Sequence, residues 1–200
     1  MNKKIIKSLN NLATELNQLS KTKKVIHCHG VFDLLHIGHI KYFQEAKSMG
    51  DVLIVTITPD RYVNKGSGRP AFNENQRTEV IAALDTVDYV AINEWPTAVE
   101  TIKLLKPDIY VKGPDYKDHN QDITGNIHLE VDAVKSLGGQ IRYTSDITYS
   151  SSSLLNKYGN IHNESQKSFI QKLLKGRNFD EIVKTVDKLQ NLKVLVLGET

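Results

Sequence analysis

The segment from Val25 to Met49 constrains the fold more than any other part of the chain. It begins with an apolar run, Val25 to Cys28, that predicts a buried strand, and it ends with a periodic segment, Gly38 to Met49, that predicts a helix. The turn from strand to helix, Gly30 to His39, has the sequence GVFDLLHIGH. A strand that passes directly into a helix is the opening unit of an open α/β sheet. In such sheets phosphates bind where the helix N-terminus offers free N–H groups and a positive dipole end.

The rest of the chain to residue 143 alternates strands with helices in the same way. The segment Asp51 to Thr58 is continuously apolar at its centre, which is typical of a parallel strand covered on both faces. The alternation therefore predicts an α/β fold with a doubly wound parallel sheet. Besides those already named, the predicted strands are 87–92, 109–112 and 140–143, and the predicted helices are 74–84, 97–105 and 127–137.

Both ends of the chain predict appendages to this sheet. Apolar residues spaced as on one helix face predict an amphipathic helix over residues 3–19, packed on the domain or on a partner subunit. Towards the other end, two apolar patterns predict helices near 169–174 and 179–189, and Lys193 to Gly198 predicts a buried strand with no helix after it. We therefore expect either a fragment of a longer polypeptide or a chain whose tail is a remnant. The expected organisation is an N-terminal helix (1–22), an α/β domain (23–160), a helical linker (161–192) and the first strand of a following domain (193–200).

Two histidines give the turn after the first strand its chemistry. His36 and His39 are three residues apart and therefore share one face of the first helical turn. Gly38 between them has no Cβ, so a ligand can approach the backbone closely. Two imidazole donors directed at one point suit the charge of a phosphoryl transition state.

The His-x-Gly-His turn with its Phe-Asp-Leu-Leu lead-in resembles the nucleotidylyltransferase superfamily, and the fold that this resemblance implies is the Rossmann-like nucleotidyltransferase fold. Within the superfamily the chain is most similar to the group of glycerol-3-phosphate cytidylyltransferase and of the heptose-phosphate adenylyltransferase part of bifunctional ADP-heptose synthase. The resemblance covers about residues 24 to 158. It implies transfer of a nucleotidyl group from CTP or ATP to a phosphorylated sugar or polyol, with release of pyrophosphate. It also implies Mg²⁺ bound with the triphosphate, a homodimer, and a role in cell-surface polysaccharide or related nucleotide-sugar synthesis.

The resemblance assigns roles to residues along the chain. The acceptor phosphate is assigned to Arg77, and no residue is assigned as a metal ligand. The expected catalytic residues are His36, His39 and Lys41. The expected nucleotide-binding residues are Val31, Phe32, Asp33, Gly38, Lys65, Lys112, Gly113, Asp115, Tyr149, Ser150, Ser151 and Ser152.

Three further features of the sequence bear on the acceptor, on metal binding and on neighbouring domains. Glycerol-3-phosphate cytidylyltransferases carry an arginine where this chain has Ser145, which argues for the heptose-type group. His27 and His29 share a strand face, but the sequence offers no third ligand, so a zinc site is not expected. The final strand resembles the opening strand of ribokinase-like sugar kinases, which suggests a fused C-terminal kinase domain.

Composition limits the partners. The net charge is only +3 over 200 residues with no basic block, so we expect no nucleic-acid partner. No run approaches the length of a membrane span, so no membrane partner is expected. The single cysteine excludes an intrachain disulfide and fits a cytoplasmic protein.

Other functions are open on the same residues. The alternative within the superfamily is a glycerol-3-phosphate-type cytidylyltransferase. Class I aminoacyl-tRNA synthetases share the His-x-Gly-His signature but need a Lys-Met-Ser-Lys-Ser loop, which this chain lacks. Flavin and pantetheine-phosphate adenylyltransferases are disfavoured by the Phe-Asp-Leu-Leu lead-in. The alternative of another class is a non-catalytic nucleotide-binding or assembly module.

Overall fold

The computed structural model of the chain contains one parallel six-stranded sheet, in the order β1-β4-β3-β2-β5-β6. This confirms the predicted α/β fold with a parallel sheet. The strands are β1 (Ile5–Ile6), β2 (Val25–Gly30), β3 (Val52–Ile57), β4 (Tyr89–Ile92), β5 (Ile109–Lys112) and β6 (Gln140–Tyr143). The residues that the structure describes are 5–6, 8–66, 68–116, 126–145, 164–174, 183–184 and 186–188.

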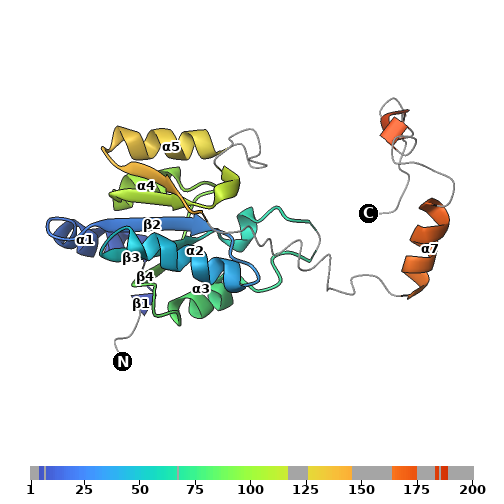
Figure 1. Cartoon of the computed structure of the whole chain (residues 1–200), viewed down its shortest axis with the longest axis horizontal. Helices are drawn as coiled ribbons and strands as arrows, with labels where there is room; N and C mark the ends of the chain where they lie inside the picture. Colours follow the sequence, from blue (N-terminus) through green and yellow to red (C-terminus); the bar gives the residue numbers. More distant parts are fainter. Residues whose placement is uncertain are drawn as a thin grey trace, which may run out of the picture. The chain divides into compact units, whose positions relative to one another are not determined.

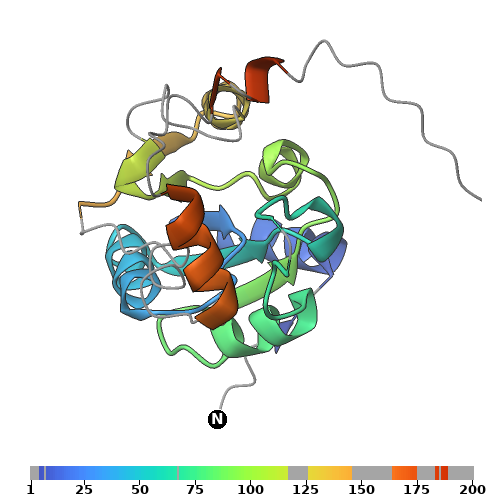
Figure 2. The same ribbon diagram turned by 90° about the vertical axis from the view of Figure 1, so that its right-hand side faces the viewer.

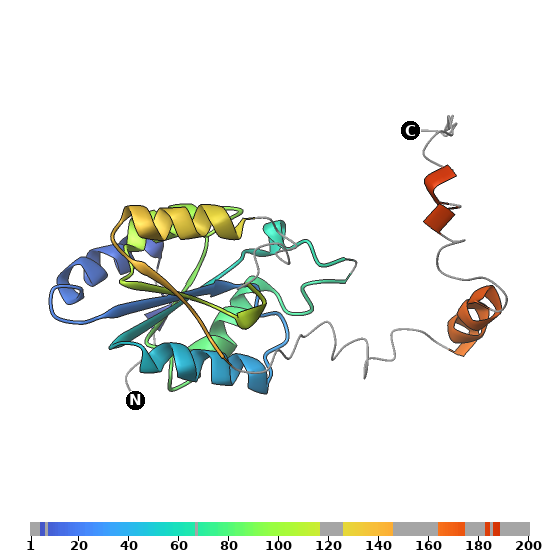
Figure 3. The ribbon, with the colours of Figure 1, turned by 45° about the horizontal axis from the view of Figure 1, so that its top comes forward.

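Helices cover both faces of the sheet, as a doubly wound fold requires. Figure 2 views the strands end-on, with α2 (Ile37–Ser48) and α3 (Glu74–Ala82) on one side and α1 (Leu9–Leu19) and α4 (Val99–Leu105) on the other. The helix α5 (Ile127–Ser136) lies beside α4, as Figures 1 and 3 both show. The apolar face under α2 and α3 is built on alternate strand residues that include Ile26, Cys28, Leu53, Val55 and Val111.

The N-terminal helix begins six residues later than predicted, because Ile5 and Ile6 form an edge strand instead. They pair in parallel with Tyr89 and Val90 of β4. The helix begins only at Leu9, since Ser8 has extended backbone angles and its hydroxyl accepts a hydrogen bond from the N–H of Asn11. The helix packs on the sheet through its apolar stripe and so belongs to the domain; the buried residues are Leu9, Leu12, Ala13 and Leu16.

The direction in which strands are added to the sheet changes at β2. From β2 the chain moves outward through β3 to β4, and it then returns across the sheet through α4 to β5 on the other side of β2. The strand order therefore reverses between β2 and β5. In open α/β sheets ligands bind at the carboxyl ends of the strands at such a point.

The chain divides into two compact units, residues 1–154 and 155–200. The second unit contains the helix α7 (Glu164–Leu174), in the region where the sequence predicts a helical extension. The predicted nucleotide-binding residues Tyr149 to Ser152 and the predicted strand at 193–198 lie outside the described residues. In the described part of the chain no helix is long and apolar enough to cross a bilayer.

Candidate active site

The two histidines of the turn lie at the N-terminus of α2, directly beyond the carboxyl end of β2. His36 is the N-cap of this helix, with extended backbone angles, and its Nδ1 accepts a hydrogen bond of 3.2 Å from the N–H of Gly38. His39 Nδ1 accepts in turn from the N–H of His36, at 3.4 Å. The two rings stack with their centroids 3.9 Å apart. The helix cap therefore fixes both imidazoles side by side where phosphate is expected to bind.

This capping arrangement determines which ring nitrogen carries the proton. Because both Nδ1 atoms accept from backbone N–H groups, a neutral ring must carry its proton on Nε2. The neutral form is favoured, since burial lowers the pKa of His36. Burial, together with His36 and the charge of Lys65, lowers the pKa of His39 to about 4. Each ring can therefore act as a neutral donor through its Nε2–H.

Phe32 supports the histidine pair from below. Its backbone has a φ of +48°, an uncommon value for a residue with a side chain. The ring contacts His39 edge-to-face at a centroid distance of 5.5 Å and packs on Phe43 at 5.0 Å. A Cβ on Gly30 would lie only 3.0 Å from the tip of the Phe32 ring, so glycine leaves the room that this ring occupies. Phe32, predicted to bind nucleotide, thus packs in the core beneath the site.

Asp33 joins the first loop of the site to the loop that precedes α3. Its carboxylate is fully buried and pairs with Nε of Arg69. It also accepts hydrogen bonds from the N–H groups of Ala71 and Phe72, at 2.7 and 3.2 Å. Both carboxylate oxygens are thus occupied inside the protein, and Asp33 holds the segment 69–72 against the turn that carries the histidines.

Lys65 lies in the same loop and is exposed. Desolvation and the nearby Arg69 guanidinium lower the pKa of Lys65, while Asp33 acts in the opposite direction. Since the charge of Lys65 also acts on His39, this lysine belongs to the cationic group around the histidine pair.

Arg77, predicted to bind the acceptor, is almost completely buried, with 1% of its side chain exposed. Its guanidinium donates to the backbone carbonyls of Phe72, Val31 and Thr58 at 2.9, 2.5 and 3.0 Å. It also pairs with the Asp60 carboxylate at 2.5 Å. These bonds join the loops after β2 and β3, so the geometry gives Arg77 contacts within the fold. Val31, predicted to bind nucleotide, therefore already accepts a hydrogen bond within the fold through its carbonyl.

Lys112 at the end of β5 is also buried. Its ammonium lies 3.0 Å from the carboxylate of Glu130 on α5, and it sits over the ring of Tyr116 at 4.4 Å. Tyr110 donates to the same carboxylate at 2.9 Å. Lys112 therefore ties β5 and the short 3₁₀ turn after it to α5. The predicted residues Gly113 and Asp115 lie in the connection that this network supports, and Asp115 is exposed.

A second pair of histidines, His27 and His29, lies within the sheet. Thr56 Oγ joins them, 2.7 Å from Nε2 of His27 and 2.9 Å from Nδ1 of His29, and Thr58 Oγ lies 3.2 Å from the other nitrogen of His29. Burial, with contributions from neighbouring positive charge, lowers the pKa of each to about 3. Both are therefore neutral polar groups of the core. In the described part of the chain no group of three or more His, Cys, Asp or Glu side chains could hold a metal ion.

Two further positions singled out in the sequence, Lys41 and Ser145, lie within the described residues. Lys41 is exposed on α2, two residues and hence about 200° around the helix from His39, so the two side chains leave different faces. Ser145 follows β6 and donates from its N–H to the Glu45 carboxylate on α2, at 3.0 and 3.1 Å. At the position where glycerol-3-phosphate enzymes carry arginine, this serine therefore ties the chain after β6 to the helix of the histidine pair.

The residues that sequence reasoning missed are Arg69, Asp60 and Glu130. Each acts through a partner distant in sequence, so no local spacing marks it. Only Arg69 had a local signal, because it lies close to Lys65, Gly66 and Gly68 in the loop that extends beyond the carboxyl edge of the sheet (Figure 3).

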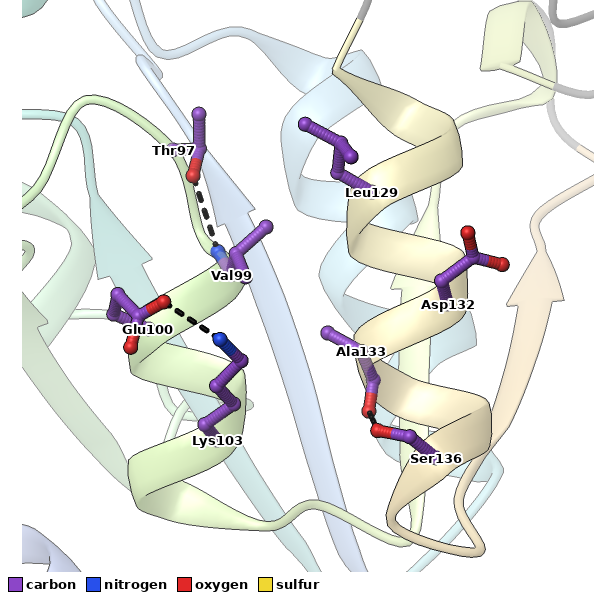
Figure 4. Close-up of a pocket in the computed structure, with 8 residues that line it drawn as sticks. All are labelled: Thr97, Val99, Glu100, Lys103, Leu129, Asp132, Ala133 and Ser136. Atoms are coloured by element: carbon purple, nitrogen blue, oxygen red, sulfur yellow. Dashed lines mark hydrogen bonds and ion pairs between the residues drawn. The ribbon is translucent and has the colours of Figure 1, made fainter.

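A hollow of about 450 Å³ lies between α4 and α5 (Figure 4). It contains none of the predicted site residues. Its lining mixes apolar and charged side chains: Thr97, Val99, Glu100, Lys103, Leu129, Asp132, Ala133 and Ser136.

Comparison with known proteins connects this geometry to one family. The family described as cytidylyltransferase-like matches residues 27–158. Among curated proteins, the Bifunctional protein HldE of Aliarcobacter butzleri is 42% identical over 140 residues, which are 68% of this chain and 29% of that protein. The protein of the same name from Campylobacter jejuni subsp. doylei is 47% identical over 131 residues, 63% of this chain and 28% of its own length. The chain thus spans less than a third of these relatives.

Two solved structures resemble the fold. The lipopolysaccharide core biosynthesis protein of Thermoplasma volcanium is 29% identical with a TM-score of 0.51, over 64% of this chain and 99% of that protein. The pantoate-beta-alanine ligase of Francisella tularensis is 18% identical with a TM-score of 0.55, over 92% of this chain and 85% of that one. At 18% identity the second likeness concerns the fold alone.

Proposed function

This chain belongs to the cytidylyltransferase-like family, and from this premise we propose that it transfers a nucleotidyl group from ATP or CTP to a phosphorylated sugar, with heptose 1-phosphate as the model acceptor. The observation that carries the proposal is the stacked pair His36 and His39 at the N-terminus of α2. This pair offers two Nε2–H donors at the positive end of a helix. Such an arrangement suits a triphosphate whose α-phosphorus is under attack.

The proposed reaction needs no nucleophile from the protein. An oxygen of the acceptor phosphate, already an anion, attacks the α-phosphorus in line. The new O–P bond forms as the bond between the α-phosphorus and the bridging oxygen breaks, and the electron pair leaves with pyrophosphate. His36 and His39 donate to the phosphate oxygens on which charge increases, so they stabilise the transition state more than the bound substrate. The remaining contribution of the protein is to orient the two substrates.

Magnesium enters this scheme with the triphosphate. Mg²⁺ in phosphoryl-transfer sites keeps several waters and is held by substrate phosphates with one or two carboxylates. The Asp33 carboxylate near the histidines is already occupied by Arg69 and two backbone N–H groups. The residues around the histidine pair therefore suit a metal brought by the substrate better than one caged by the protein. The bound ion would reduce the charge of the triphosphate.

The choice of acceptor is supported by likeness. Relatives named Bifunctional protein HldE and a structural neighbour named for lipopolysaccharide core biosynthesis favour a sugar phosphate over glycerol 3-phosphate. Ser145, in place of the arginine of the glycerol-phosphate enzymes, points in the same direction. The bifunctional relatives also support a second catalytic domain in the natural polypeptide, for which we propose a sugar kinase after residue 192.

Pyrophosphate release tests the proposal. We would measure it with Mg²⁺ for ATP and CTP, each against heptose 1-phosphate, glycerol 3-phosphate and ribitol 5-phosphate. One strong pair with heptose 1-phosphate is expected. Turnover with glycerol 3-phosphate alone would replace the proposed acceptor. No turnover with any pair, while ATP or CTP still binds, would favour a non-catalytic nucleotide-binding module.

A further inference from the structure

We propose that Arg69 is a phosphate-binding residue of this site, held in position by Asp33. The proposal rests on the proposed function and adds a residue to it. The ligand chemistry is a phosphate oxygen, which either the nucleoside triphosphate or the acceptor phosphate could supply.

The first support is the way in which Arg69 is held. Its Nε pairs with the buried Asp33 carboxylate, and 11% of its side chain is exposed. Asp33 also accepts from the N–H groups of Ala71 and Phe72, which fixes the backbone just after Arg69. Asp33 follows Phe32, whose ring contacts His39. The guanidinium is therefore fixed to the same turn that carries the histidine pair.

The second support is a donor without an acceptor. Nη2 of Arg69 is buried and has no hydrogen-bond partner among the described residues. A buried donor of a charged group that is left without an acceptor is costly in free energy. Buried polar groups without partners are few in native proteins, and each calls for an explanation. A phosphate oxygen accepting from this guanidinium would supply the missing partner.

The third support is positive charge close to Arg69. The positive charges of Arg69 and Arg77 contribute to lowering the pKa of Lys65, and the charge of Lys65 contributes to lowering the pKa of His39. Asp60 is paired with Arg77, and Asp33 is the carboxylate of this group that pairs with Arg69. Lys65 and the N-terminal end of α2 add further positive charge, which a triphosphate or a phosphate would balance.

Asp33 has a distinct part in this arrangement. Its carboxylate occupies Nε of Arg69, which leaves the terminal nitrogens of the planar guanidinium for a phosphate oxygen. Asp33 is then a positioning residue that acts through Arg69. Lysine at position 69 could keep the ion pair with Asp33, but it would have no second nitrogen for phosphate.

The test compares Arg69→Gln and Arg69→Lys with Arg142→Gln, a matched change at an exposed arginine on β6 whose guanidinium contacts Gln140. Affinity for inorganic tripolyphosphate is measured by calorimetry, and thermal unfolding verifies the fold. We expect both Arg69 variants to bind tripolyphosphate about tenfold or more weakly, with Arg69→Lys as stable as the wild type. A purely structural Arg69 would instead be rescued by lysine. Wild-type tripolyphosphate affinity in Arg69→Lys, together with wild-type KM values for both substrates, overturns the proposal.

Kinetics then identify the phosphate. A raised KM for the triphosphate alone assigns Arg69 to the nucleotide, and a raised KM for the acceptor alone, with unchanged tripolyphosphate affinity, assigns it to the acceptor phosphate. Unchanged KM values for both substrates, together with unchanged tripolyphosphate affinity, overturn the proposal. If the wild-type chain binds tripolyphosphate but turns over no substrate pair, the proposed function fails while the binding comparison still decides the role of Arg69.

Discussion

The ammonium of Lys112 lies 3.0 Å from the carboxylate of Glu130, and the two side chains are only 8% and 6% exposed. A resemblance in sequence assigns Lys112 to the nucleotide, whereas the structure also gives it a partner on α5. The pair joins the end of β5, where the strand order reverses, to the helix that covers it. Its two charges lie away from water, so neither can lose its partner without a large cost.

Glu130→Gln should therefore destabilise the protein by about 3–5 kcal/mol, because it leaves the Lys112 ammonium buried without a counter-charge. The double change Lys112→Met with Glu130→Leu should recover much of that loss, since no buried charge remains. Urea unfolding measures the free energy of unfolding of the single and the double variant. The control is Glu100→Gln, which removes the partner of Lys103 in an exposed pair and should change stability by less than about 0.5 kcal/mol. Equal effects at the two glutamates would contradict the buried-pair argument.

Arg77→Lys should destabilise the protein by about 2 kcal/mol or more, although the charge is kept. An ammonium cannot reproduce the fork that bonds three carbonyls and the Asp60 carboxylate. Unfolding in urea checks the magnitude. Hydrogen exchange of the loops that supply the carbonyls of Val31 and Thr58 should accelerate in the same variant. Wild-type stability in Arg77→Lys, with a raised KM for the acceptor, would instead support the acceptor-binding role predicted from the sequence.

The strands of this fold could be predicted because their burial is continuous. The runs in β2 and β3 lie between helical layers, and this produces apolar stretches that local pattern reveals. The edge strand could not be predicted, because Ile5 and Ile6 fit the apolar spacing of the helix that follows. Their strand depends on pairing with Tyr89 and Val90, more than eighty residues away.

The same distinction applies to the site. His36 and His39 could be identified because the chemistry requires them close together on one helical turn. The tasks of Asp33 and Arg77 could not be read from the sequence, since their partners come from other loops. Sequence pattern identified some of the charged residues near the site, such as Lys65 and Arg77, and only tertiary contacts distinguish those with partners inside the fold.

Replacement of either histidine of the pair should lower kcat about 10²–10³-fold with the fold intact, because each removes a donor to the transition state. For His36 the substitution is His36→Asn, since asparagine is also a good N-cap and keeps α2 in place. For the second position it is His39→Ala. Steady-state rates of pyrophosphate release give kcat. His128→Ala, at an exposed position on α5, is the control. Near-wild-type turnover in either variant would exclude the proposed role of that histidine.

Chelation of Mg²⁺ should abolish turnover and leave stability unchanged. If Mg²⁺ binds only together with the triphosphate, it does not stabilise the protein in the absence of substrate. We expect EDTA to stop pyrophosphate release and the unfolding temperature in the absence of nucleotide to be the same with and without Mg²⁺. An increase of that temperature by Mg²⁺ alone would indicate a site held by the protein.

Acid should destabilise this protein from about pH 6.5 downward, because His27 and His29 are neutral in the fold. Burial lowers the pKa of each to about 3, whereas a histidine in the unfolded chain has a pKa near 6.5. Between these values the unfolded state binds protons that the native state does not. Stability is therefore complete above about pH 6.5 and decreases as pH falls towards 3, by up to about 1.4 kcal/mol per pH unit for each histidine.

Urea unfolding from pH 7 down to the acid limit of folding measures this slope. His27→Gln should reduce the slope by the contribution of one histidine, whatever its effect on stability at pH 7, since it removes one group that the unfolded chain protonates. His128→Gln is the matched control on the exposed face of α5 and should leave the slope unchanged. If His27→Gln kept the full wild-type slope, protonation of the buried His27–Thr56–His29 network would not be the cause of acid destabilisation.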